Sequence, residues 1–587
     1  TGTSESDYVW EDALNHPDKF YKEFSKSYNN TKVKELYSQL DTSFTPSSLF
    51  RLLIKAKTVR HYLSQILLSD SFKKERKRED WNRYLKIDMI SLNPDYKSIL
   101  PTYGHPYSHR YNLKAILGYE VRFFYDAFLY LENSEDLEFT KLFNFYLLSK
   151  SLFHKTIVQQ SNQYGFDQFE KITVNEIREY SEKKYFNRFN QIKGMYGQSY
   201  EYIEGRFAPK NTKEKLHSLV DRIIEDYESF CKQEEKLKKS FPILVLVGHF
   251  IKVPDKRKTK DIYTFRDYPL RMDLNNRAKL FIDLLKTHPK YTYYIRGIDA
   301  AGNELYARPE VFAPAFRYIT KRINLMPTDY YLTEETYLMS TFYRTKIKKY
   351  LSKTPELGIT YHAGEDFIHL ISGIRMVYEA VEFLDMPSKS RIGHATALGI
   401  CPKLWIESSG RKLKIAQGEW VDNLVFISFF LQKNKNLIDL NSEIKDSIDH
   451  YWYEIYNEKA PSLHYLKQIF TCRKLDPSII KSEKNKIYKV DEEEWDKEKI
   501  LGFEPSDEVF ESFKKYHNPK YMKKYNNTIE VDISEEWVDL LKSLQEEMIR
   551  LLNQKNIAIE TMPTSNMRIS FYENYEQHHI FNSYDPT

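Results

Sequence analysis

The chain has 587 residues, more than one ordinary domain needs, and it carries a net charge of only +5. A charge this small neither requires nor excludes a nucleic-acid partner. No apolar run approaches the length that spans a bilayer, and the three cysteines (Cys231, Cys401 and Cys472) are scattered without metal-type spacing. The composition therefore argues against a membrane protein and predicts a protein of the reducing cytoplasm.

The first third of the chain predicts helices rather than a site. Residues 46–70 place apolar side chains at helical spacing, and residues 111–190 are helical and aromatic with few breakers. His105 and His109 have the spacing of two metal ligands on one helix, but Pro106 makes a helix interior unfavourable. A loop is therefore favoured over a metal pair at this point.

Two strands follow in the second third of the chain. Residues 202–209 predict a strand that a proline stops, and a helix follows it. Residues 241–250 form a continuous apolar run, which is typical of a strand buried on both faces of a parallel sheet. His249, at the end of this run, either faces a pocket or caps the strand. Arg266 and Arg271, in the segment that follows, are interpreted as solvated surface, the alternative being a phosphate contact.

A third strand is predicted at residues 291–298, after a helix at residues 276–287. The strand is expected to end in a loop at residues 299–304, with the sequence Asp-Ala-Ala-Gly-Asn-Glu. Taken alone, such a loop is a plain turn. Its position between other polar strand ends favours a pocket.

The centre of the chain is a strand that ends on a histidine. The apolar run at residues 357–361 leads into His362, Gly364 permits a tight turn, and Glu365 is expected at the start of the next helix. A further strand ends at His394. This βαβ unit places three ionisable groups on the rim where β/α barrels keep their chemistry.

A long charged and aromatic insertion then interrupts the alternation. Residues 401–550 predict a mostly helical subdomain. Residues 557–566 return to a strand, which ends in Pro-Thr-Ser-Asn, and residues 575–580 resemble a helix start.

Four strand ends together resemble the adenosine and AMP deaminase family. They are His-Ala-Gly-Glu at 362–365, Arg-Ile-Gly-His at 391–394, the loop at 299–304, and Pro-Thr-Ser-Asn at 563–566, where Met562 replaces the family's cysteine. The resemblance implies a (β/α)8 barrel of the TIM type. Six of its strand ends are present in family order, and strands one and eight are expected outside the sequence given.

The expected organisation follows from this resemblance. Residues 1–400 would form a deaminase-like barrel with helical insertions at about 28–195. Residues 401–550 would form the inserted helical subdomain, and residues 551–587 would return to the barrel.

The resemblance implies zinc-dependent hydrolysis of the amino group at C6 of adenine. His362 would be a ligand of Zn²⁺, and the other ligands would come from strands one and eight. Glu365 would protonate N1 of the purine, and His394 would lie beside the water that zinc activates. Gly302 would offer its backbone to the purine, and Asp299 would shape that loop.

The long insertions resemble those of the deaminase subunits of the RADAR phage-defence system. This implies adenosine, an adenine nucleotide or RNA as substrate, a large homo-oligomer and an ATPase partner. The alternative hypothesis is a barrel that has lost catalysis and serves as a structural subunit. A third, weaker hypothesis is a related amidohydrolase that acts on another ring.

Overall fold

The fold is described from a computed structural model of the chain. It describes residues 46–68, 105–109, 116–158, 184–193, 201–239, 241–255, 265–324, 357–409, 412–431, 440–479, 506–563, 565–566, 572 and 575–580. The chain divides into two compact units, an N-terminal unit (Thr1–Ile177) and a C-terminal unit (Arg178–Thr587). In the described part of the chain, no helix has the length and apolar character that crossing a membrane requires.

The described N-terminal unit is helical. Helix α4 (Pro46–Leu68) confirms the helix predicted at 46–70, and α6 (Ile116–Asn133) and α7 (Leu137–Val158) lie within the helical stretch predicted at 111–190. Apolar side chains of the three helices form one core, which includes Leu63, Phe123 and Phe139.

His105 belongs to this core rather than to a described metal site. It precedes a short 3-10 turn (Pro106–His109), and its Nε2 lies 3.0 Å from Oε2 of Glu120. Glu120 also pairs with Arg60 at 3.1 Å and Lys150 at 2.8 Å. Burial raises the pKa of Glu120, but these partners outweigh it and hold the pKa below its ordinary value.

The C-terminal unit is an α/β structure built on a parallel six-stranded sheet. The strand order is β1-β2-β3-β4-β5-β8, so each strand pairs with its predecessor in the sheet series. The bounds are β1 Tyr202–Phe207, β2 Ile243–Ile251, β3 Ile295–Ala301, β4 Gly358–Ala363, β5 Arg391–His394 and β8 Ala558–Glu560. The strands predicted around 202, 241, 357, 390 and 557 are confirmed.

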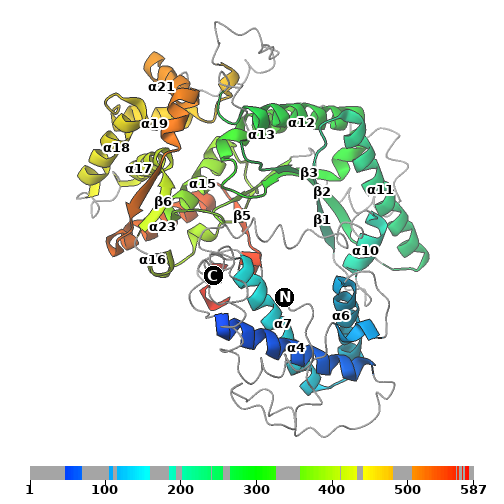
Figure 1. The fold of residues 1–587 in the computed structure, drawn as a ribbon. Coiled ribbons are helices and arrows are strands. Elements are labelled where there is room, and N and C mark those ends of the chain that lie inside the picture. The colour runs from blue at the N-terminus through cyan, green and yellow to red at the C-terminus, as the bar shows by residue number, and fades with distance from the viewer. Residues whose placement is uncertain are drawn as a thin grey trace. The chain divides into compact units, whose positions relative to one another are not determined.

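The sheet curls like part of a barrel (Figure 1). Side-chain contacts across its concave face show the curvature. Arg206 of edge strand β1 lies 2.6 Å from Glu560 of the opposite edge strand β8. Glu204 of β1 lies 2.6 Å from Arg391 of β5. Because successive side chains of a strand point to opposite faces, Ile203 and Phe207 of β1 instead join the apolar core.

Helices cover the convex face of the sheet. Apolar side chains of these helices and the strands form the main core of the unit, for example Leu216, Phe281 and Phe316. Figure 1 shows the helices following one another along the outside of the curve. Their bounds are α10 Tyr185–Lys193, α11 Lys213–Lys236, α12 Tyr268–Thr287, α13 Pro309–Asn324, α15 Leu370–Phe383 and α23 Val538–Gln554.

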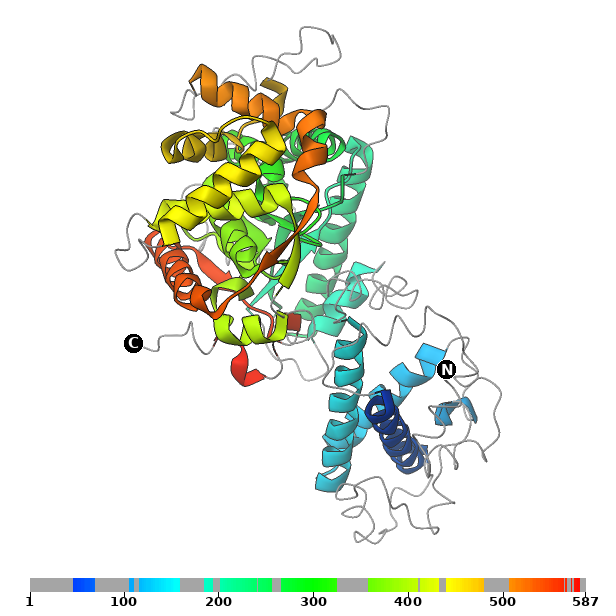
Figure 2. The same ribbon diagram turned by 60° about the vertical axis from the view of Figure 1, so that its left-hand side comes forward.

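The insertion after β5 is mostly helical, as predicted, and forms a block beside α15 (yellow to orange in Figure 2). It also contains a two-stranded antiparallel sheet that the sequence analysis missed, with Lys412 paired to Asp532 at one end. The bounds are α16 Pro402–Ser409, β6 Lys412–Ala416, α17 Gln417–Leu431, α18 Leu440–Tyr456, α19 Leu463–Cys472, η9 Pro477–Ile479, α21 Asp507–His517, α22 Pro519–Tyr525, β7 Thr528–Asp532 and η11 Glu535–Trp537.

Three predicted boundaries are wrong. Helix α12 begins at Tyr268 rather than 276, since Pro269 suits the first turn of a helix. The third strand begins at Ile295, because Pro289–Tyr293 forms a 3-10 helix, and it continues through Asp299, which was expected in a loop.

The helix that follows Glu365 was also placed too early. Helix α15 begins at Leu370, where the ring Nδ1 of His369 accepts the backbone N–H of Ile371 at 3.1 Å and caps the helix. Glu365 therefore lies in the turn between β4 and α15, not at a helix start.

Candidate active site

The carboxyl end of β3 carries a buried aspartate that binds two histidines from its neighbouring strands. Asp299 Oδ1 lies 3.0 Å from Nδ1 of His362 on β4, and Oδ2 lies 2.8 Å from Nδ1 of His249 on β2. Burial raises the pKa of Asp299, but the two histidines outweigh it and hold this pKa below its ordinary value. An ionised carboxylate only accepts hydrogen bonds, so each histidine donates its Nδ1–H to Asp299.

Two cations hold this group in place. Arg206 Nη1 lies 3.2 Å from Nε2 of His362 and 3.2 Å from Oδ2 of Asp299. Lys252 is buried, donates from Nζ to the carbonyl oxygen of His362 at 2.5 Å, and lies 4.4 Å above the ring centroid of Tyr361. Burial lowers the pKa of Lys252, and the nearby carboxylates oppose this effect.

The turn after His362 is fixed by a second carboxylate of the β3 segment. Glu304 Oε2 accepts the backbone N–H of Gly364 at 2.7 Å and that of Glu365 at 3.2 Å. Gly364 has a φ of 86°, which favours glycine. Gly302 has a φ of 110°, and a Cβ there would lie 3.2 Å from the carbonyl oxygen of Lys252. The segment 299–304 thus supports the neighbouring turn, a role the sequence did not reveal.

Glu365 and His394 meet at a third residue, Asn566. Glu365 Oε1 lies 3.0 Å from His394 Nδ1, and Asn566 Nδ2 lies 2.6 Å from the first atom and 2.8 Å from the second. Burial raises the pKa of Glu365 well above its ordinary value, and nearby Asp366 adds to this shift. Burial likewise lowers the pKa of His394 well below its ordinary value. Burial therefore favours the neutral form of both groups.

Strand β5 brings the two halves of the site together. His394 has a φ of 65°, an uncommon backbone conformation that carries strain at a strand end. A Cβ at Gly393 would lie 2.8 Å from the His362 ring, so glycine allows that ring to pack on β5. The ring centroids of His362 and His394 are consequently 5.1 Å apart.

The structure brings four of the predicted site residues to neighbouring positions. His362, Glu365, His394 and Asp299 are all buried at the carboxyl ends of β3, β4 and β5. Gly302 lies at the same edge, just after β3.

Sequence reasoning missed several other contributors. Asn566 was part of a quoted motif without a role, and the face of His249 was left open. Glu304 likewise stood in a quoted motif without a role, and Lys252 and Arg206 were given no role because their partners come from other strands. Two further predictions are wrong: Arg266 and Arg271 are buried rather than solvated.

The fit of a metal to these residues can be tested at His362. A carboxylate behind Nδ1 is the usual second partner of a metal-binding histidine, but Nε2 of His362 lies 3.2 Å from Arg206 Nη1. His362 therefore fits as one ligand only if Arg206 moves away from Nε2. Within the described ranges, no group of three or more His, Cys, Asp or Glu side chains is arranged to hold a metal ion.

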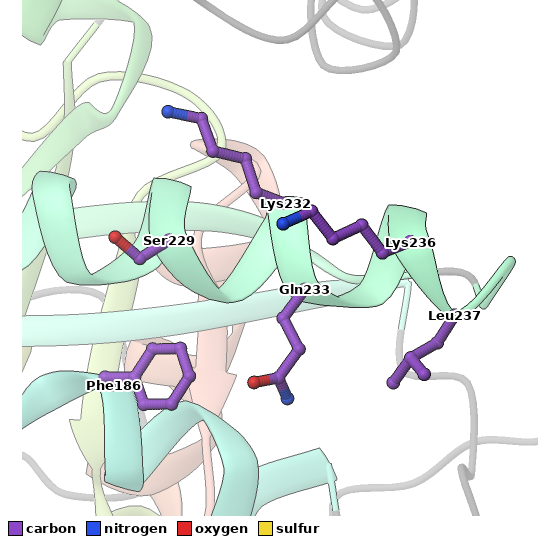
Figure 3. A pocket seen from close by; sticks show the side chains of 6 residues that line it. All are labelled: Phe186, Ser229, Lys232, Gln233, Lys236 and Leu237. Carbon is purple, nitrogen blue, oxygen red and sulfur yellow. The ribbon is translucent and has the colours of Figure 1, made fainter.

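A separate hollow of about 430 Å³ lies between α10 and α11. Figure 3 shows Phe186 of α10 and Gln233 of α11 on one side of the helix, with Lys232 extending from another. None of the predicted site residues lines it, so the chemistry described above lies elsewhere. In comparisons with known proteins, no protein-family model matches the chain, and no curated protein matches it.

Proposed function

We propose that the C-terminal unit catalyses zinc-dependent hydrolytic deamination of adenine, in a nucleoside, a nucleotide or RNA, to the inosine form. The observation that carries the proposal is the contact between Glu365 Oε1 and His394 Nδ1 at 3.0 Å, beside His362. A proton donor, a neutral imidazole and a metal-type histidine are the groups this reaction needs at one place. We further propose that the curled sheet is part of a (β/α)8 barrel, in which such groups lie at the carboxyl ends of strands.

Glu365 is the proton donor of the proposed reaction. An ordinary glutamate is ionised at pH 7. Burial and the neighbouring Asp366 raise the pKa of Glu365, so it keeps a proton that it can give to a ring nitrogen of adenine. Protonation of that nitrogen makes C6 more electrophilic, which favours attack by water.

His362 would hold the metal, and His394 would act beside it. Zn²⁺ bound at such a site supplies activated water at neutral pH. Asp299 accepts the Nδ1–H of His362, so a metal ion would bind Nε2, where it would displace Arg206 Nη1. His394 is neutral and offers an N–H to orient an attacking oxygen. Gly302, which lies at the same edge of the sheet, would approach the purine.

A second candidate function is a structural subunit without catalysis. The contact of Arg206 Nη1 with His362 Nε2 at 3.2 Å favours it, because a fixed cation there competes with a metal ion. The defence role, the large homo-oligomer and the ATPase partner remain predictions.

The test combines metal analysis with inosine formation from adenosine, ATP, dATP and RNA. We expect zinc in the protein, activity that chelation removes, and about 10²–10⁴-fold less turnover in Glu365→Gln, as general-acid catalysis contributes about this much. Glu407→Gln makes the same chemical change at an exposed position of α16 and should leave turnover unchanged. Wild-type turnover in Glu365→Gln would remove the proposed donor.

His394→Ala separates the two candidate functions further. If His394 acts on the attacking oxygen, the variant keeps its zinc and loses turnover. Loss of the metal would instead make His394 a ligand. A wild-type protein that binds no zinc and converts none of the four substrates would favour the structural subunit.

A further inference from the structure

Asn566 lies buried between the proposed acid and a second buried histidine, His578. Its amide nitrogen contacts Glu365 and His394, and its amide oxygen contacts His578 Nε2 at 3.1 Å. We infer that Asn566 and His578 are positioning residues that fix which ring nitrogen of His394 carries the proton and that hold Glu365 beside it. The hydrogen bonds that run from Ile580 through His578 and Asn566 to Glu365 and His394 are called the relay below. The role of the relay in catalysis rests on the proposed deamination, whereas the proton position that it sets does not.

The relay begins at backbone groups, whose donor character is unambiguous. The N–H of Ile580 donates to His578 Nδ1 at 3.2 Å, so the neutral ring must carry its proton on Nε2. Burial lowers the pKa of His578, which keeps the ring neutral. The direction of the first hydrogen bond is therefore set by the main chain.

The orientation of the Asn566 amide follows from two donors. His578 Nε2–H points to Asn566 Oδ1, and the backbone N–H of Met562 donates to the same oxygen at 3.2 Å. An amide turned the other way would place its NH₂ group against both donors. The NH₂ group consequently faces Glu365 and His394.

An NH₂ group only donates, so both atoms it meets must accept. Nδ2 lies 2.8 Å from His394 Nδ1, which therefore carries no proton and leaves the ring N–H at Nε2. Nδ2 lies 2.6 Å from Glu365 Oε1. A hydroxyl oxygen accepts as well as a carbonyl oxygen does, and Oε1 also lies 3.0 Å from the unprotonated His394 Nδ1, so these contacts fix the proton of His394 but not which oxygen of Glu365 carries the acid proton.

This pattern serves the proposed reaction. The O–H bond of Glu365 breaks as the N–H bond at the ring nitrogen forms, and the new carboxylate keeps a charge-assisted hydrogen bond from Asn566. His394 meanwhile presents Nε2–H on the opposite edge of its ring. A reversed amide would place Oδ1 against Glu365 Oε1 and draw a proton to His394 Nδ1.

The first test reads the proton position in the wild-type protein. The ring nitrogens of His394 are observed by ¹⁵N solid-state NMR of the histidine-labelled protein, with the signal assigned by its absence in His394→Gln. Protonated and unprotonated ring nitrogens resonate in separate ranges. We expect an unprotonated Nδ1 and a protonated Nε2. A protonated Nδ1 in the wild type overturns the relay.

The second test compares a variant that keeps the donor at this position with one that removes it. His578→Gln can still donate to Asn566 Oδ1, whereas His578→Leu offers the amide no hydrogen bond and allows it to reverse. We expect His578→Gln to keep the His394 tautomer and turnover. We expect His578→Leu to place a proton on Nδ1 and to lower kcat about 100-fold, within the range of acid–base catalysis, with KM little changed. An equal loss in both variants overturns the relay.

The two tests separate the relay from the proposed function. A wild-type protein that deaminates adenine but carries the His394 proton on Nδ1 refutes the relay alone. A protein with the expected tautomer that deaminates none of the substrates refutes the function alone.

Discussion

Two buried clusters of charged side chains in the C-terminal unit, one around Asp422 and one around Glu365, shift the pKa of these two carboxyl groups in opposite directions. Asp422 of α17 pairs with Arg473 at 2.6 Å and with Arg308 at 2.7 Å, and it accepts a hydrogen bond from Tyr525. Burial raises its pKa, but the arginines outweigh this and hold the pKa below its ordinary value. In the described part of the chain, no lysine or arginine lies within ion-pair distance of Glu365, whose pKa rises.

The difference shows what each cluster does. Arg308 precedes α13, Arg375 lies on α15, and Glu419 and Asp422 lie on α17, so their ion pairs join the insertion to the helices that cover the sheet. A carboxylate ionised in this way contributes to stability. A carboxylic acid kept neutral by burial has a proton to give, which is the property of a catalytic group. Burial alone therefore does not distinguish a structural carboxyl group from a catalytic one. The presence or absence of a neighbouring cation does.

The largest effect is expected at Asp422. Asp422→Asn leaves Arg473 and Arg308 without an ionised partner at this position, which should lower the free energy of unfolding by about 3–5 kcal/mol. Denaturant unfolding followed by circular dichroism measures the change. Asp446→Asn, at an exposed position of α18, should shift it by less than about 0.5 kcal/mol. A small loss at Asp422 would mean that the cluster does not join the insertion to α15.

A smaller change of opposite sign is expected at Glu365. The pKa of Glu365 is higher in the folded protein than its ordinary value of 4.5. The contribution of this group to the free energy of unfolding is therefore fully present below pH 4.5 and is lost as the pH rises. Glu365→Gln removes this loss, so at pH 7 the variant should be more stable than the wild type while its turnover falls. Unfolding at pH 5 and pH 8 tests the sign, since the gain should be larger at pH 8. A variant less stable than the wild type at both pH values would contradict the assigned proton.

The smallest effect is expected at Glu379, the exception within the arginine cluster. Arg375 contacts it at 2.5 Å, but burial raises its pKa to about 7. The free energy of unfolding of the wild type, relative to Glu379→Gln, should fall between pH 4.5 and about 7 and then level off. Paired unfolding curves across this range measure it. If this difference in the free energy of unfolding instead rises with pH, the pKa of Glu379 is lowered, as that of Asp422 is.

Local patterns predicted the strands and most of the polar residues that end them. The apolar run before His362 and the short strand before His394 were sufficient, because strand length and turn chemistry are local properties. The helix after Glu365 was placed too early, because the apolar spacing continues into a turn that His369 ends by capping α15.

The electrostatics of the site could not be predicted in the same way. Asn566 lies 201 positions from Glu365 in the chain, and no local pattern shows that they touch. Arg266 and Arg271 were expected on the surface because arginines usually are. Arg266 is instead held 4.1 Å from the ring centroid of Tyr516, which belongs to the insertion.

The place of Asn566 in the chain has a consequence for synthesis. A ribosome completes His362, Glu365 and His394 long before it reaches residues 566 and 578. A nascent chain, or one cut inside the insertion, would carry the acid and the imidazole without the amide that sets their protons. Under the proposed function, such a chain would not deaminate adenine. The protein would become active only after the insertion and the residues that follow it have been synthesised.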